Sequence, residues 1–517
     1  MSTTSAPVAP VEQHRDEPSS RWWDAAAGLV ALGAGLAAAE LVGLVTSRSA
    51  TPVVAVSDTV VDLTPPWAKD AAIALFGTND KVFLFAVVAT VAALVGATAG
   101  VLERRRPPLG ALLTAALGVT VAAAALTRPD TGTLSVLPGA VAAVVGIVVL
   151  RVLLARLVVT GAGPRRRVVL LVGTGAAALG AGLGAGLLRR VGARGGEEAR
   201  AAVELPTAAE QAPPLPEQGT YDDVPGLAPF RTPNPDFYRI DTALVVPRLT
   251  TRDWRLRIGG MVEREVELTW DDVLARPLVE KWATLSCVSN RVGGDLVGNA
   301  LWLGVPTREL LAEARPLPGA DMVLSRSTDG FTAGTPVEAM TDDRDSLLAI
   351  GMNGEPLPLE HGFPARLVVP GLYGYVSATK WVTEMTLTTF AQDQGYWTPR
   401  GWSARGPVKI SSRIDRPGGS DVRAGEVVVA GLAWAMDVGV AAVEVQVDDG
   451  PWQEAELADA GTSSTWRQWR WAWQADPGSH TLRVRAIDQA GDVQIEEPAP
   501  PAPDGAQGYD EVTVRVT

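Results

Sequence analysis

The sequence predicts an α-helical membrane bundle of five helices, then an α+β domain and a C-terminal β-sandwich. Long apolar stretches are confined to residues 1–188, mixed strand and helix patterns follow, and the last hundred or so residues show strand patterns alone. A chain of 517 residues and 54.2 kDa is long enough for two to four structural units.

Charge is divided unevenly along the chain. Residues 1–200 hold 18 Lys and Arg against 13 Asp and Glu, whereas the rest holds 27 against 45, and the total is −13. A basic, apolar front and an acidic back are typical of a membrane anchor that carries an exposed domain. An acidic domain cannot neutralise phosphates, so no nucleic-acid partner is expected.

Five apolar stretches follow a polar, Pro- and Ser-rich segment at 1–20, which we expect to be a disordered cytoplasmic tail. About 20 apolar residues cross the hydrocarbon core of a bilayer. Glu40, near the end of the first stretch, has two interpretations: a proton-relay group, or a side chain that snorkels to the interface. Within an anchor at 21–188, the predicted spans are 22–45, 82–102, 109–126, 134–150 and 168–188.

Arginines in the short loops predict the orientation. One side carries Arg15, Arg21, Arg104, Arg105, Arg106, Arg165, Arg166 and Arg167, and the other carries Asp58, Asp62, Asp70, Asp80 and Asp130. The positive-inside rule places the arginines and the N-terminus in the cytoplasm. An odd number of helices then places the later domains outside the cell membrane, although Arg189 and Arg190 oppose this orientation.

The fifth stretch begins with Arg166-Arg167-Val-Val-Leu170 and is rich in glycine. It resembles an internal twin-arginine export signal, a route for folded proteins that suits a domain loaded with its cofactor before export. The alternative is a glycine-rich helix that packs closely against its neighbours. Because the spans hold no histidine or cysteine and few polar groups, we expect an anchor or docking bundle and disfavour a transporter.

The soluble part begins after a linker at 189–220, which is rich in Ala, Pro and Glu. At 221–403 strands and helices are mixed. The alternating run 254–260 predicts a strand, Thr269 an N-cap with Asp272 three residues later, and Pro306 the start of another helix. Buried strands are expected at 322–325 and 366–370.

At 404–517 only strand patterns remain, and they predict an immunoglobulin-like β-sandwich. We expect tryptophans of this region to pack in the core and on strand faces. The strands are expected at 427–433, 443–447, 469–473, 481–487 and 512–516, and the tryptophans are Trp452, Trp466, Trp469, Trp471 and Trp473.

The single cysteine, Cys287, lies where a predicted strand enters a polar, glycine-marked loop. One cysteine excludes an intramolecular disulfide, a Cys-rich zinc site and an iron–sulfur cluster held by four thiolates. The chain has three histidines, too few to make a histidine-ligated haem a good expectation. From the residues alone, Cys287 is an inert buried thiol, a nucleophile paired with His361, or a thiolate ligand of a redox metal.

Two motifs resemble the sulfite oxidase superfamily. Cys287-Val-Ser-Asn290-Arg291-Val-Gly-Gly, continued at 299–306, is similar to its molybdenum-binding segment, and 352–381 is similar to a second long motif that contains His361, Arg366, Ser377 and Lys380. Asp236-Phe-Tyr238-Arg239 matches a cofactor-contacting segment more loosely. The resemblance covers about 221–517, where the sandwich is similar to a dimerisation domain.

The resemblance implies a molybdopterin-dependent oxidoreductase, in which one molybdenum is held by one pterin dithiolene and by Cys287. No haem, iron–sulfur cluster or flavin is expected. Cations and the glycine-flanked 371–380 segment suit the anionic phosphate of a pterin, and Asn290 would orient the thiolate loop. His361 is either a cofactor contact or a structural histidine. The implied cofactor contacts are Tyr238, Arg239, Asn290, Ser327, His361, Arg366, Ser377 and Lys380.

The sequence departs from the family at the substrate contacts. Sulfite oxidases hold sulfite with several arginines, two of them consecutive after the Asn, but here Val292 follows Arg291. Arg239 and Arg291 remain as expected catalytic anion contacts beside Cys287, and sulfite oxidation is disfavoured.

We expect oxygen-atom transfer on an extracytoplasmic small molecule, with electrons exchanged with a separate partner, in a membrane-anchored chain that is a possible homodimer. The alternative is a cofactor-free extracellular binding or assembly module on the same anchor.

Overall fold

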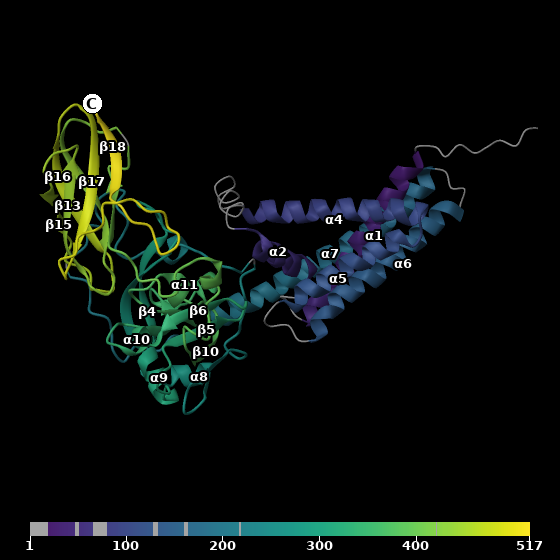
Figure 1. The fold of residues 1–517 in the computed structure, drawn as a ribbon, viewed down its shortest axis with the longest axis horizontal. Helices are drawn as coiled ribbons and strands as arrows, with labels where there is room; N and C mark the ends of the chain where they lie inside the picture. The colour runs from purple at the N-terminus through teal and green to yellow at the C-terminus, as the bar shows by residue number, and fades with distance from the viewer. Residues whose placement is uncertain are drawn as a thin grey trace, which may run out of the picture. The chain divides into compact units, whose positions relative to one another are not determined.

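The computed structural model describes residues 19–46, 51–65, 80–127, 133–159, 164–216, 219–243, 245–419 and 421–517. The predicted tail up to residue 18, Asp70 and Asp130 lie outside these ranges. The chain divides into two compact units, Met1–Val191 and Gly192–Thr517, and each is described by itself (Figure 1).

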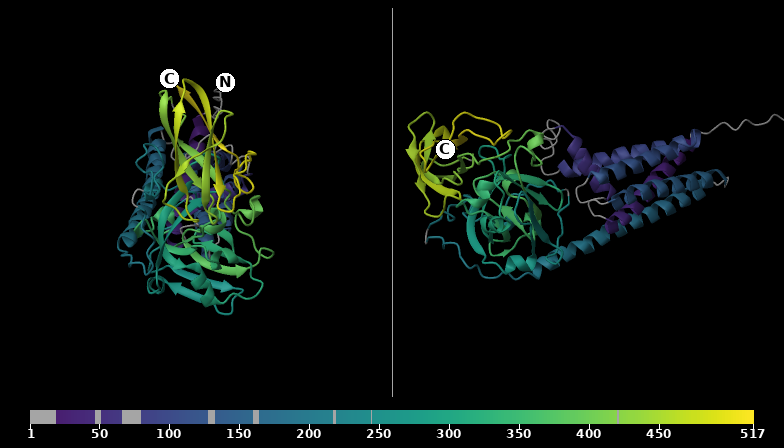
Figure 2. Two further views of the ribbon diagram at one scale, coloured as in Figure 1. Left: turned by 90° about the vertical axis from the view of Figure 1, so that its left-hand side faces the viewer. Right: turned by 60° about the horizontal axis from the view of Figure 1, so that its bottom comes forward.

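Five helices of the first unit are long and apolar enough to cross a membrane, which confirms the predicted number among the described residues. Helices α1, α4, α5 and α6 lie side by side (Figure 2). The sequence analysis missed the short helix α2, which begins at a proline, a residue suited to the first helical turn. The helices are α1 Ser19–Thr46, α2 Pro52–Leu63, α4 Asp80–Arg105, α5 Leu109–Leu126, α6 Leu137–Val159 and α7 Pro164–Ala201, with a 3₁₀ turn at Thr133–Val136.

Glycines let the apolar helices approach closely. A Cβ added at Gly28 of α1 would lie 2.0 Å from the carbonyl oxygen of Gly96 in α4. A Cβ added at Gly35 of α1 would lie 2.6 Å from the carbonyl oxygen of Ala142 in α6. Small residues at such crossings replace the hydrophobic drive that is missing within lipid.

Helix α7 differs from the other long helices in two ways. It continues to Ala201, into the segment predicted as a linker, because Ala, Arg and Glu favour helix even beyond the apolar part. Its glycines Gly180, Gly182 and Gly184 have no atom of the described residues within 4 Å of an added Cβ. The structure therefore shows no close packing at these three glycines, whereas Leu171, nearer the start of α7, is buried in a cluster with residues of α1 and α6.

Acidic side chains of this unit contact helix ends and arginines. Glu40 Oε1 accepts the backbone N–H of Val53 at 3.2 Å, at the start of α2, where a negative charge is favourable. This contact is a role that neither interpretation of Glu40 anticipated. Asp24 Oδ1 lies 3.1 Å from Arg104 Nε, so α1 and α4 are joined by an ion pair as well as by glycine packing.

The second unit begins with a mixed α/β domain built on two five-stranded sheets, as the sequence predicts. In the first sheet, in the order β2-β1-β10-β5-β6, β1 and β10 are parallel and the other pairs are antiparallel. This sheet comprises β1 Arg255–Gly260, β2 Val266–Thr269, β5 Met322–Ser327, β6 Thr332–Pro336 and β10 Val382–Thr388. The second comprises β3 Val279–Ser286, β4 Val297–Pro306, β7 Leu347–Met352, β8 Glu355–Pro356 and β9 Arg366–Val368.

Short helices connect these strands. Thr269 caps α8 in a capping box with Asp272, which confirms the predicted N-cap. The helices are α8 Trp270–Leu274, α9 Thr307–Ala314, α10 Val337–Thr341 and α11 Gly374–Ser377, with 3₁₀ turns at Asn234–Asp236, Leu359–His361 and Thr398–Arg400.

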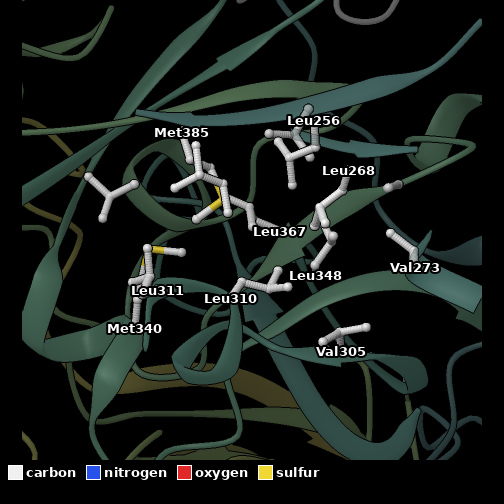
Figure 3. Close-up of a cluster of buried hydrophobic side chains, with 14 of the residues drawn as sticks. Leu256, Leu268, Val273, Val305, Leu310, Leu311, Met340, Leu348, Leu367 and Met385 are labelled. Carbon is white, nitrogen blue, oxygen red and sulfur yellow. The ribbon is translucent and has the colours of Figure 1, made fainter. Parts of the chain in front are cut away.

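One apolar core joins the two sheets of the α/β domain. Figure 3 shows Leu256 and Met385 of the first sheet near Leu348 of the second, with Leu310 and Leu311 of α9 in the same cluster. Burial of this many large aliphatic side chains makes both sheets a rigid frame for the loops at their ends.

The C-terminal region consists of two four-stranded antiparallel sheets, ordered β11-β12-β16-β15 and β14-β13-β17-β18. Val429 and Trp469 of one sheet share a core with Val443, Leu482 and Val514 of the other. All five strands expected from the alternating pattern are present. The strands are β11 Ser411–Arg416, β12 Gly425–Trp434, β13 Val440–Val447, β14 Gln453–Glu454, β15 Glu456–Leu457, β16 Arg467–Ala475, β17 Gly478–Asp488 and β18 Asp510–Val516.

The close crossing of α1 and α4 predicts a position-dependent effect of larger side chains. We expect Gly28→Leu to lower the stability of the membrane unit by about 1–3 kcal/mol, because the new side chain collides with the Gly96 backbone. Thermal unfolding of the full chain in detergent measures the change. Gly33→Leu is the matched control, since no described atom lies within 4 Å of a Cβ there, and equal loss of stability in both variants would contradict the packing argument.

Candidate functional site

A cavity of about 130 Å³ opens in the α/β domain, where several chain segments meet. Cys287 directly follows β3, and Ser327 is the last residue of β5. The other walls come from the segments 237–242, 361–381 and 397–402. Side chains far apart in sequence are thus held together by the ends of rigid strands.

Cys287 is buried, with 8% of its surface exposed, and lines this cavity. Its backbone N–H donates to Leu296 O at 2.9 Å, and its Sγ accepts the N–H of Ser289 at 3.4 Å. Burial raises the pKa of the Cys287 thiol, an effect that the Ser289 hydrogen bond partly opposes. Among the described residues no hydrogen bond joins Cys287 to His361, although both line the cavity.

Arg366 at the start of β9 is a deeply buried cation. Only 5% of its surface is exposed, and its guanidinium carbon lies 5.1 Å from the centre of the Trp302 ring. Its Nη1 donates to His361 O at 3.1 Å and its Nη2 to Ala378 O at 3.4 Å, and burial lowers its pKa to about 10. Among the described residues no carboxylate pairs with Arg366, so its guanidinium is a buried charge without a direct counter-charge.

Asp241 forms ion pairs with Arg239 and Lys380, the two other cations expected from the sequence to contact the cofactor. Lys380 Nζ donates to Asp241 Oδ1 and, at 3.1 Å, to Glu360 O. Arg239 Nε lies 2.6 Å from Asp241 Oδ2. The Asp241 side chain is 1% exposed, and its charge is shared by Lys380 and Arg239. The sequence analysis missed Asp241, because the pairing depends on the path of an irregular segment rather than on a regular helix or strand.

His361 and Tyr238 are neutral polar groups in the cavity wall. His361 Nε2 donates to Asn234 O at 3.1 Å, since a carbonyl can only accept, and the ring meets Phe237 edge-on. Burial, and then the charge of Arg366, lowers the pKa of His361 to about 4. Burial, and then Cys287, raises the pKa of Tyr238. Neither group offsets the charge of Arg366 at neutral pH.

The predicted site residues divide into two groups. The structure brings Tyr238, Cys287, Ser327, His361, Arg366 and Lys380 together on the cavity wall. Asn290, Ser377, Arg239 and Arg291 do not line it. Asn290 Oδ1 accepts the N–H of Leu296 and closes the cysteine loop, and Ser377 Oγ donates to Leu372 O and Tyr373 O. Arg291 is exposed.

Four aromatic side chains complete the wall and were not identified from the sequence: Phe331, Tyr375, Trp397 and Trp402. The crowding of Tyr396, Trp397 and Trp402 near the end of the domain was the available signal. Three of these rings are in contact, since the ring centres of Tyr375 and Trp397 lie 6.0 Å and 6.4 Å from that of Trp402.

Comparison with known proteins supports the family suggested by the motifs. A family model for the oxidoreductase molybdopterin binding domain matches residues 243–397. The uncharacterized oxidoreductase YuiH of Bacillus subtilis is 34% identical over 153 residues, which are 30% of this chain and 74% of YuiH. This chain belongs to the sulfite oxidase family of molybdopterin-dependent oxidoreductases.

Other members and neighbours are more distant or longer. Mitochondrial sulfite oxidase of Mus musculus is 30% identical over 321 residues, which are 52% of this chain and 58% of that protein, so the chain spans little more than half of this relative. The sulfane dehydrogenase SoxCD structure from Paracoccus pantotrophus aligns with a TM-score of 0.49 and 24% identity, covering 56% of this chain and 84% of that one.

The described residues of this sulfite oxidase family member fit a molybdopterin. A pterin phosphate is an anion, and the buried guanidinium of Arg366 lacks one. A thiolate is a soft ligand suited to a redox metal, and Cys287 lies on the same cavity wall. The donor set and the uncancelled charge therefore match the group that the family binds.

The C-terminal sheets brace the cysteine loop of this oxidoreductase. Arg413 Nη1 of β11 donates to Gly294 O at 2.8 Å, and its Nε lies 2.7 Å from Asp415 Oδ1. A Cβ added at Gly293 would lie 2.4 Å from Asp510 Oδ1 in β18. The sandwich thus holds the loop that follows Cys287 from two of its strands.

The buried neutral state of His361 predicts a pH dependence of stability. The unfolded chain binds a proton near the ordinary pKa of 6.5, and the folded chain near 4, so stability is lost as the pH falls from 6.5 through 4, by at most about 3 kcal/mol. We expect His361→Gln to remove this part of the pH dependence in unfolding measurements. His480 is the control, because Asp448 raises its pKa and its stabilisation is lost as the pH rises. If the His361→Gln variant loses stability between pH 6.5 and 4 as the unaltered chain does, His361 is not the group responsible for this pH dependence.

The bond from Arg413 to Gly294 predicts that the sandwich stabilises the cysteine loop. We expect Arg413→Met to destabilise the second unit by about 1.5–3 kcal/mol, because Asp415 loses its cationic partner and the charge-assisted bond to Gly294 O is removed. Hydrogen exchange at Gly294 and Leu296 should become faster. Arg470→Met removes an exposed pair with Glu456 and should cost less than about 1 kcal/mol. Unchanged exchange in Arg413→Met would exclude the bracing role.

Proposed function

We propose that this chain is a membrane-anchored enzyme that uses a mononuclear molybdenum cofactor to transfer an oxygen atom to or from a small extracytoplasmic molecule. Electrons are exchanged with a separate partner. The observation that carries the proposal is the buried, unpaired guanidinium of Arg366 on the same cavity wall as the single thiol. Family membership supports the cofactor and the reaction class.

The residues of this chain have distinct proposed roles. The bound molybdopterin supplies two-electron oxygen-atom transfer at molybdenum. Cys287 Sγ holds the metal and loses its proton on binding, since burial otherwise keeps the thiol protonated. Arg366 binds the phosphate of the pterin. The carbonyl oxygens of His361 and Ala378 accept hydrogen bonds from its guanidinium and fix the orientation of that group. Lys380, oriented by Asp241, contacts the cofactor as a second cation.

The neutral polar groups of the site are proposed to orient the bound cofactor and the thiolate loop by hydrogen bonds, without adding charge. His361, fixed on Asn234 O, keeps its unprotonated Nδ1 as an acceptor. Tyr238 retains its hydroxyl proton because burial raises its pKa, so it can donate a hydrogen bond beside Cys287. Ser327 contributes a hydroxyl to the wall, and Asn290 orients the thiolate loop by closing it.

We infer the side of the membrane from the apolar helices and the arginine distribution. Five candidate spans, together with the positive-inside rule applied to the arginine-rich loops, support a location of the catalytic domain and the C-terminal sheets outside the cell membrane. Export of a folded, loaded domain is supported by Arg166-Arg167 at the start of α7. The proposed limits of the molybdopterin-binding domain are 221–403. The C-terminal sheets, at 404–517, are proposed as an immunoglobulin-like sandwich that joins two copies of the chain.

The alternative, a cofactor-free binding module, has no physical account of Arg366. A buried cation without a partner is costly, and a domain that binds no anion there would be more stable with an apolar residue in its place. Retention of this arginine beside the cysteine favours the enzyme.

Metal and pterin analysis of the purified full chain tests the proposal. We expect about one molybdenum per chain, lost in Cys287→Ser, and loss of both pterin and molybdenum in Arg366→Met, because the phosphate loses its cation. Pterin fluorescence after denaturation measures the second component. Arg257→Met, which alters an exposed pair with Glu265, is the control and should retain both. Normal molybdenum in Cys287→Ser would refute the ligand, and absence of pterin from the unaltered protein would favour the binding module.

A further inference from the structure

We propose that the substrate of this enzyme is an uncharged organic molecule with a ring-sized apolar group beside its reacting atom, and not an inorganic oxyanion. The inference rests on the proposed function, and it follows from the charges and the aromatic surface of the cavity.

The charges of the cavity leave no cation for an anionic substrate. Among the described residues that line it, Arg366 and Lys380 are the cations. Arg366 matches the cofactor phosphate, and Lys380 is held by Asp241. His361 is neutral. Any further oxyanion would enter a site whose positive charges are already matched, and it would be desolvated without compensation.

The two arginines expected to bind an anion are directed elsewhere. Arg239 lies outside the lining and is paired with Asp241 at 2.6 Å. Arg291 is exposed and does not line the cavity. Asp329 does line it, and accepts the Thr242 hydroxyl at 3.2 Å and the Phe331 N–H at 3.3 Å. This carboxylate would repel an anion at the wall.

An apolar group, in contrast, finds a prepared surface. Phe331, Tyr375, Trp397 and Trp402 line the cavity and are each partly exposed. Tyr375 is fixed by its hydroxyl, which donates to Ser403 O at 2.5 Å, and its ring is tilted by 51° against Trp402. Rings held in this way stack on a flat apolar group at little entropic cost.

Binding of matched probes to the molybdenum-loaded full chain tests the inference. Methyl phenyl sulfoxide, its 4-carboxylate analogue and sulfate are titrated by calorimetry without an electron donor, so that no turnover is required. We expect the neutral sulfoxide to bind at least about tenfold more tightly than the carboxylate or sulfate, because only the charged probes need a cation. Tighter binding of sulfate or the carboxylate would overturn the inference.

Variants separate the aromatic surface from general stability. Trp402→Ala should weaken binding of methyl phenyl sulfoxide about tenfold, and Trp402→Phe should retain most of it, since a ring remains. Trp452→Ala, on the sandwich, is the control and should leave binding unchanged. If Trp402→Ala binds the neutral probe as well as the unaltered chain does, the aromatic surface is not the substrate wall.

Molybdenum analysis of the same preparation distinguishes failure of the proposed molybdenum-dependent function from failure of the proposed substrate class. A chain without molybdenum fails the proposed function. A chain that contains molybdenum but prefers the anionic probes fails only the inference on the substrate class.

Discussion

The functional site depends on one unbalanced interaction, the burial of the Arg366 guanidinium without a carboxylate. Carbonyl oxygens of His361 and Ala378 orient the group, but dipoles do not cancel a full charge in a medium of low dielectric constant. Burial lowers the pKa of Arg366 only to about 10, so the cation persists at neutral pH. A bound anion removes this cost, and stability and cofactor binding are coupled at this residue.

A second constraint is the position of Cys287 between the α/β sheets and the C-terminal sheets of the second unit. Its strand belongs to the sheet β3-β4-β7-β8, whereas its loop is held by Arg413 from the sandwich. Thr284, three residues before the cysteine, also exchanges hydrogen bonds with Ser464 and Trp466. The sandwich therefore contributes to the geometry of the metal ligand, although it supplies no residue to the cavity wall among those described.

The two units obey different packing physics. In the membrane unit, glycines such as Gly28 and Gly35 allow helix backbones to touch, because lipid offers no hydrophobic drive for association. In the second unit, large side chains such as Trp302 and Trp466 fill water-excluding cores. In the second unit the single carboxylate of Asp241 pairs with two cations, Arg239 and Lys380.

The sequence by itself determined the five apolar helices, the order of the parts, the strands of the C-terminal region and the cysteine motif, because each depends on local composition, periodicity or spacing. It also identified Arg366, His361 and Lys380, which lie in one motif. Only the tertiary structure decided that Asp241 pairs with Lys380 and Arg239, that Arg291 is exposed, and that Trp397 and Trp402 meet Tyr375. Those facts depend on contacts between segments as much as 139 residues apart, and no local pattern encodes which side chain will meet which across such a distance.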